Sequence, residues 1–91
     1  MSEQKNIITP ELLKSKIEQS LSGNFHEVLV SDMSNGCGQN FEVVVVSDFF
    51  LNKNKLVRCR FVNKALAQEI SEIHAFSCKC FTIKEWEKIV I

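Results

Sequence analysis

The stretch Phe25–Phe50, FHEVLVSDMSNGCGQNFEVVVVSDFF, decides the fold that we expect for this chain. Its two ends, Phe25–Met33 and Phe41–Phe50, are rich in the β-branched and aromatic residues that favour strands. Four consecutive valines in Phe41–Phe50 indicate a strand that is covered on at least part of both faces. The polar segment Ser34–Asn40 between them carries two glycines, so the whole stretch predicts an antiparallel hairpin.

Helix and strand signals flank this hairpin on both sides. The tripeptide TPE at residues 9–11 combines an N-cap, a first-turn proline and an acidic residue, and it predicts a helix that runs to Gly23 as its C-cap. Downstream, Arg60–Ile70 carries apolar residues at helical spacing, and Ile73–Phe81 alternates as a third strand. The last segment, TIKEWEKIVI at 82–91, opens with a capping-box spacing and predicts a final helix.

The expected element order is therefore α-β-β-α-β-α, in the α+β class. The third strand follows a helix, and a strand reached through such a crossover usually pairs parallel to its predecessor. We expect a three-stranded mixed sheet with helices on one face. The 91 residues suffice for one domain, 1–91, in which residues 1–8 are expected to be flexible.

Composition narrows the range of functions. A hydrophobic content of 45% with 24% charged residues is typical of a globular chain. The formal net charge is zero, so any contact with nucleic acid or a membrane surface needs a local patch. The N-terminus lacks an apolar or arginine-rich targeting pattern, and no apolar run approaches the roughly 20 residues that span a bilayer. We expect a cytoplasmic protein that does not engage membranes.

The cysteines do not form a familiar zinc pattern. Cys78 and Cys80 make a C-x-C pair, whereas zinc ribbons and fingers use pairs of wider spacing. Free cysteines often behave as small hydrophobes, so both are predicted to lie in the core or on a sheet face. Cys59 stands between Arg58 and Arg60, whose charges would lower its pKa if the thiol were exposed.

Cys37 lies in the most turn-prone part of the chain and has three interpretations. The three are a turn residue without further role, a nucleophile and a metal ligand. No protease or nucleophile-elbow signature surrounds it, which weakens the second interpretation and makes an enzyme the least favoured class. A ligand needs a partner, and His74 at the start of the third strand is the candidate, although the pattern alone favours a core or surface histidine that is hydrogen-bonded to a neighbour. His26 is predicted to be a surface residue.

One segment is locally basic on a chain of zero net charge. NKNKLVRCRFVNK, residues 52–64, carries five cations and no acidic residue. Three interpretations remain open: a solvated rim, contact with nucleic-acid phosphates, or docking of an anionic partner. The cations are Lys53, Lys55, Arg58, Arg60 and Lys64.

LVRCRFVNKALAQEI at 56–70 and IHAFSCKCFTIKEW at 73–86 resemble the BolA family. The similarity extends from TPELLKSKI at 9–17 to Trp86, and it implies a class II KH-like fold with the hairpin first. Two features depart from the family pattern. Cys59 stands where a histidine is typical, and LNKNKL at 51–56 replaces a loop with a glycine-lysine pair.

The resemblance also implies a function. BolA proteins partner monothiol glutaredoxins with a C-G-F-S site, and the pair can hold a [2Fe–2S] cluster to which a glutathione thiolate also contributes. The implied ligands here are His74 and Cys37, because the cytosolic branch has a cysteine four residues before the phenylalanine that matches Phe41. This implies a non-enzymatic iron–sulfur adaptor, monomeric when alone, in the cytoplasm or also the nucleus, active in cluster trafficking or iron homeostasis. The alternative is a KH-like nucleic-acid-binding transcriptional regulator.

Overall fold

The computed structural model describes residues 7–36 and 38–90 and has the expected order, with two short helical segments added. The elements are α1 (Pro10–Ser20), β1 (Glu27–Asp32), β2 (Asn40–Val46), the 3-10 helix η1 (Asp48–Phe50), α2 (Lys55–Ala65), α3 (Ala67–Ile70), β3 (Ala75–Phe81) and α4 (Ile83–Val90).

The three strands form one mixed sheet in the order β1-β2-β3. β1 pairs antiparallel with β2, so that Val28 lies opposite Val45. β2 pairs parallel with β3, so that Phe41 lies beside Phe76. The predicted hairpin and the predicted parallel crossover are both confirmed.

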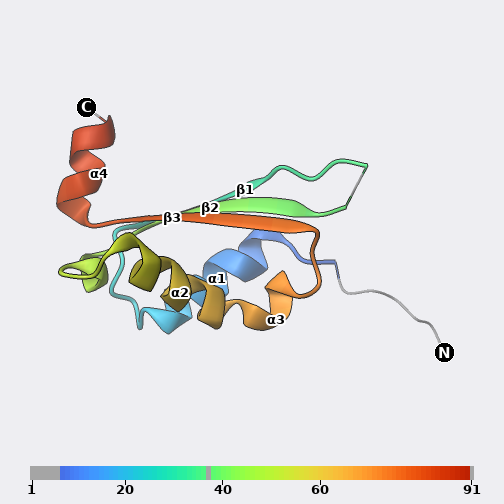
Figure 1. Ribbon diagram of the computed structural model, residues 1–91, viewed down its shortest axis with the longest axis horizontal. Helices are drawn as coiled ribbons and strands as arrows, with labels where there is room; N and C mark the ends of the chain where they lie inside the picture. Colours follow the sequence, from blue (N-terminus) through green and yellow to red (C-terminus); the bar gives the residue numbers. More distant parts are fainter. Residues whose placement is uncertain (1–6, 37, 91) are drawn as a thin grey trace.

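Helices α1, α2 and α3 cover one face of the sheet, whereas α4 leaves the end of β3 on the other side (Figure 1). The core lies between the sheet and the three covering helices. α4 contacts the sheet through Trp86, whose ring centroid is 5.6 Å from that of Phe81, and it leaves Ile89 and Val90 more than half exposed. Among the described residues, the fully buried apolar side chains are Phe41, Val43, Val45 and Val46 of β2 together with Leu13, Ile17, Phe50, Val62 and Leu66.

Helix α1 begins as predicted and ends differently. The Thr9 side chain accepts a hydrogen bond from the backbone N–H of Leu12, as an N-cap does. The C-cap is Leu21, so the prediction of Gly23 at that position is wrong. Ser22 and Gly23 both take positive φ, 54° and 79°, and the Gly23 N–H bonds the Glu18 carbonyl. This is a Schellman ending in which a serine, rather than a glycine, occupies the left-handed position.

The second strand is shorter than the sequence predicts. β2 ends at Val46, and the Ser47 hydroxyl accepts the Phe49 N–H, which begins η1. Ser47 is itself buried and donates to the Asn24 carbonyl. The turn at Ser47 directs Phe50 into the core, and the burial of its side chain there favours the turn over a longer strand.

The predicted single helix over 60–70 is longer and is interrupted. α2 already begins at Lys55, because the Asn54 side chain accepts the Val57 N–H. Leu66, with φ −111° and ψ 19°, separates α2 from α3. None of these helices, within the part of the chain that is described, is long and apolar enough to cross a membrane.

Candidate metal centre

Hydrogen bonds hold the hairpin loop around Cys37, although Cys37 itself lies outside the described residues. Asn35 and Gly38 form an antiparallel bridge: the Gly38 N–H bonds the Asn35 carbonyl at 3.1 Å, and the reverse bond is 3.4 Å. The Asn40 N–H bonds the Ser34 hydroxyl at 3.0 Å. The backbone on either side of the predicted loop ligand is therefore tied into the hairpin.

Asp32 closes the base of the same loop. Its carboxylate accepts the Ser34 N–H at 2.9 Å. Hydrogen bonds from the Ser34 side chain and backbone hold the pKa of Asp32 below its ordinary value. The carboxylate is thus ionised at neutral pH and acts as a turn-closing acceptor.

The loop meets the start of β3 at His74. The His74 N–H donates to the Gln39 carbonyl at 2.8 Å, and the Ala75 N–H donates to the same oxygen at 3.1 Å. A Cβ placed on Gly38 would lie 3.0 Å from the His74 Cβ, and Gly38 has φ +126°. Only glycine fits this position without strain, because it alone adopts that φ freely and allows the backbone to approach so closely.

Gln39 also ties the N-terminal segment to this end of the sheet. Its side-chain oxygen accepts the Ile8 N–H at 3.2 Å, and its side-chain nitrogen donates to the Ile8 carbonyl at 2.8 Å. Residues 1–6 of the segment expected to be flexible lie outside the described residues, whereas Ile8 is 4% exposed and joins the core.

The His74 side chain is exposed and available to a ligand. Within residues 7–36 and 38–90, its imidazole makes no hydrogen bond or ion pair. It borders an open groove of about 490 Å³, which Asn63 and Ile70 also line. His26, the other histidine, is exposed as predicted, and its N–H bonds Val46 at the opposite end of β2.

The predicted basic patch is smaller than its sequence suggests, because Arg58 is buried. Its guanidinium donates to the carbonyls of Lys53 at 2.8 Å and Cys80 at 3.2 Å, and it forms an ion pair with Glu85 at 2.7 Å. Hydrogen bonding to Arg58, followed by a backbone hydrogen bond, lowers the pKa of Glu85 to about 2. Arg58 therefore joins α2 to β3 and α4 and is not part of an exposed surface.

The other four cations are separated. Lys53 donates to the Phe49 carbonyl at 3.0 Å and lies 4.5 Å from the centre of that ring. Arg60 and Lys64 are exposed and four residues apart, so they share one face of α2. Lys55 lies about half a turn away from that face. The exposed patch that remains is Arg60 with Lys64.

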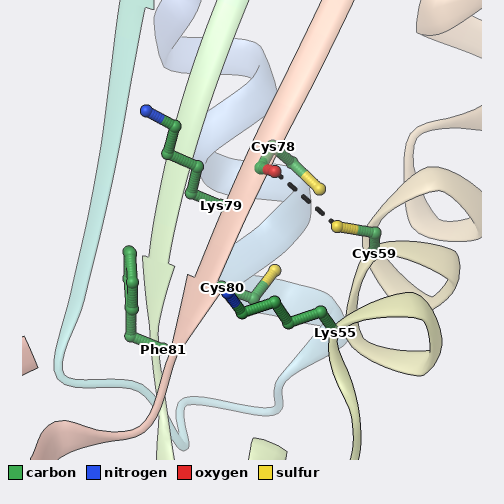
Figure 2. Close-up of a pocket in the computed structure, with 6 residues that line it drawn as sticks. All are labelled: Lys55, Cys59, Cys78, Lys79, Cys80 and Phe81. Carbon is green, nitrogen blue, oxygen red and sulfur yellow. Dashed lines mark hydrogen bonds between the residues drawn. The ribbon is translucent and has the colours of Figure 1, made fainter. Parts of the chain in front are cut away.

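The structure brings Cys59 of α2 next to the C-x-C pair of Cys78 and Cys80 on β3. The Sγ atoms of Cys59, Cys78 and Cys80 all lie within 4.8 Å of one another (Figure 2). Cys80 is buried and Cys78 half-buried, as predicted. Burial, then contact with Cys78, raises the pKa of Cys59 to about 11, so the flanking arginines do not activate it. The cluster forms because α2 packs over β3 and brings Cys59 to the other two cysteines. The only sign of it in the sequence was the C-x-C spacing of Cys78 and Cys80, which places both on one face of a strand.

Known proteins resemble this chain in both sequence and fold. A family model described as BolA-like protein matches residues 9–85. BolA-like protein 2 of Saccharomyces cerevisiae is 54% identical over 84 residues, which cover 92% of this chain and 69% of that protein. The Escherichia coli protein named DNA-binding transcriptional regulator BolA is 33% identical, over 84% of this chain and 81% of its own. The crystal structure of a bol-like protein from Babesia bovis superposes with a TM-score of 0.83 at 36% identity, covering 94% of this chain and 98% of that one.

Proposed function

Because this chain belongs to the BolA-like protein family, we propose that it is a non-enzymatic iron–sulfur adaptor. In this proposal it binds a monothiol glutaredoxin with a C-G-F-S site and contributes two ligands to a shared [2Fe–2S] cluster. The glutaredoxin cysteine and a glutathione thiolate supply the other two ligands. The setting is cytoplasmic cluster trafficking or iron homeostasis.

The contact between Gly38 and His74 is the observation that carries the proposal. The loop residue that would touch His74 is a glycine with its φ at +126°, and the preceding residue in the sequence is Cys37. The hairpin thus places the neighbour of a thiol directly against the only histidine at this end of the described sheet. This proximity of Gly38 to His74 supports the ligand pair that the family resemblance implies.

The donor set fits such a cluster. The imidazole of His74 is exposed and has no partner within the described residues, so it can bind without first breaking a protein contact. A bound cluster would supply iron–sulfur redox chemistry, and in Rieske centres histidine ligation raises the reduction potential. This chain's own part is to hold the base of the His74 side chain: the His74 backbone is bonded to Gln39, and the Gly38 backbone lies against its Cβ.

The exposed pair Arg60 and Lys64 supports docking of an anionic partner beside this site. Both residues lie next to Asn63 on α2, and Asn63 lines the groove that His74 borders. Glutathione carries carboxylates, which such cations attract. Charge reversal of Lys64 to Glu should therefore weaken association more at low than at high salt.

The proposal is tested by mixing the chain with a C-G-F-S glutaredoxin, glutathione, ferrous iron and sulfide under anaerobic conditions. Visible absorption and circular dichroism should report a heterodimer distinct from the glutaredoxin homodimer. Cys37→Ala and His74→Ala should each alter the spectrum. His26→Ala is the matched control, since it removes an exposed histidine at the other end of β2, and it should leave the spectrum unchanged. If both ligand variants give the wild-type spectrum, the proposed ligands are wrong.

A second candidate is a nucleic-acid-binding regulator, which the name of the Escherichia coli relative favours. The burial of Arg58 weighs against it, because a phosphate-binding surface needs exposed cations. Binding of duplex DNA that falls steeply with salt and is lost in Arg60→Glu and Lys64→Glu would support the regulator. DNA binding that does not respond to these variants would exclude this surface.

A further inference from the structure

The cluster of Cys59, Cys78 and Cys80 lies on the helix-covered side of the sheet (Figure 2). Cys78 and Cys80 are two residues apart on β3 and therefore share a face, and Cys59 reaches them from the second turn of α2. The Cys59 thiol donates to the Cys78 carbonyl at 3.6 Å. All three are free thiols.

This cluster is separate from the candidate cluster site at His74. Cys78 follows His74 by four positions along the extended chain, and at about 3.3 Å per residue this separates the two by roughly 13 Å. Cys37 adjoins Gly38, which lies against His74 and not against the three thiols. One ion or cluster cannot use both sets of ligands without rearrangement of the sheet.

The donor atoms determine which metal the cluster suits. Each donor is a sulfur, and soft thiolates select Cu(I), zinc or iron–sulfur clusters over harder ions. Structural zinc takes four ligands, and no fourth histidine, cysteine or carboxylate joins the group within the described residues. Three thiolates around one Cu(I), with metal–sulfur bonds of about 2.3 Å, lie about 4 Å apart. The observed separations, up to 4.8 Å, are close enough for side-chain rotation to reach that geometry.

The surroundings of the three thiols let a metal ion enter and partly balance the negative charge of a metal–thiolate group. A pocket of about 240 Å³ opens beside the three thiols, and Cys59 and Cys78, which are both partly buried, line it. The Lys55 side chain extends from α2 toward Cys80 (Figure 2). Cu(I) with three thiolates carries a net charge of −2, which this ammonium would partly offset. Lys79 points to the other side of β3, where it pairs with Glu42 at 3.3 Å.

We propose that Cys59, Cys78 and Cys80 form an independent binding site for one Cu(I) ion. Binding replaces each S–H bond by a Cu–S bond and releases one proton per thiol, with no change in oxidation state. The bound ion links α2 to β3 and so stabilises the packing of the crossover helix on the sheet. The proposal does not depend on the proposed function at His74.

Anaerobic titration with Cu(I) in competition with bicinchoninate tests the site. The wild type should hold one Cu(I) per chain, and X-ray absorption should report sulfur neighbours only, three in number. Cys59→Ser and Cys78→Ser should each lower the affinity by about 100-fold or more, since even ligand-orienting partners cost 10–100-fold when lost. Cys37→Ser is the matched control and should retain wild-type copper affinity.

Thermal unfolding separates a lost ligand from a damaged fold. Cu(I) should raise the unfolding midpoint of the wild type but not that of Cys59→Ser, while the metal-free midpoints remain similar. Wild-type affinity in Cys59→Ser, loss of copper in Cys37→Ser, nitrogen or oxygen neighbours, or displacement by equimolar Zn(II) would each overturn the proposal. Cys59→Ser should leave glutaredoxin-dependent cluster assembly intact, so the two sites fail independently.

Discussion

Gly38→Ala should damage the loop that holds His74, whereas Gly36→Ala should not. An alanine at position 38 would have to keep φ near +126°, and its Cβ would lie 3.0 Å from the His74 Cβ. Backbone held in such a region costs on the order of 1–3 kcal/mol for a residue with a side chain. The contact adds to this cost, because both partners belong to hydrogen-bonded backbone.

Gly36 provides the control two residues away. Its φ is not positive, and an added Cβ would meet nothing within 4 Å. Alanine there restricts the unfolded chain and should stabilise by about 0.4–1 kcal/mol. The two variants should therefore differ by roughly 2–3 kcal/mol, which corresponds to about 10 °C or more in the unfolding midpoint of a domain of this size.

Thermal unfolding followed by circular dichroism measures this difference, and hydrogen exchange locates it. The amides of His74 and Ala75, which both donate to Gln39, should exchange faster in Gly38→Ala and at the wild-type rate in Gly36→Ala. Midpoints that agree within about 2 °C, together with unchanged exchange at His74, would refute the close packing of the loop against β3.

Three further predictions follow from other parts of the fold. Ser22→Gly should stabilise by about 0.5–1 kcal/mol in urea unfolding, because serine holds φ 54° where glycine is unstrained; a loss of stability would contradict the Schellman ending. The folded-state pKa of Glu85 lies below its ordinary 4.5, so its contribution is complete above pH 4.5 and is lost as the pH falls toward about 2. Glu85→Gln should lower stability at pH 7 by about 1 kcal/mol after solvent screening and flatten this acid limb; a wild-type acid limb would contradict the Arg58 pairing. Because the pKa of Cys59 is about 11 against an ordinary 9.0, its thiolate fraction is about 100-fold smaller than that of an unperturbed cysteine. Alkylation of Cys59 at pH 8, located by mass spectrometry, should therefore be slower than that of an unperturbed thiol by about the same factor. Rapid labelling of Cys59 would contradict the raised pKa.

The hairpin and the order of elements could be predicted because their signals are local. The valine-rich strand, the glycine-bearing loop and the alternation in β3 depend on residues close together in sequence, and TPE at 9–11 begins α1 as expected. The mixed sheet followed from the general preference for parallel crossover connections.

The errors arose where distant contacts override local preference. Ser47–Phe50 has strand-forming aromatics, yet the burial of Phe50 and the cap at Ser47 turn it into η1. Leu66 interrupts a segment with good helical periodicity while its side chain remains fully buried. The burial of Phe50 and Leu66 depends on how the sheet and α1 are placed around them, and a short stretch of sequence does not contain that information.

The same limit applies to the sites. His74 at the start of a strand was a candidate by position, and its exposure agrees with that role. Arg58 looked like a surface cation because its partner, Glu85, lies 27 residues further along the chain. The thiol cluster likewise depends on the packing of α2 over β3. Cys59 lies 19 residues before Cys78, so the sequence did not connect it with the Cys78–Cys80 pair.

The central claim is that His74 is a ligand of a cluster shared with a glutaredoxin. Pulsed electron paramagnetic resonance of the reduced complex tests it most directly, with ¹⁵N-histidine in this chain and an unlabelled glutaredoxin. The account predicts a ¹⁵N coupling to the cluster that is present in the wild type and in His26→Ala and absent in His74→Ala. A complex without ¹⁵N coupling, or one whose coupling persists in His74→Ala, would contradict it.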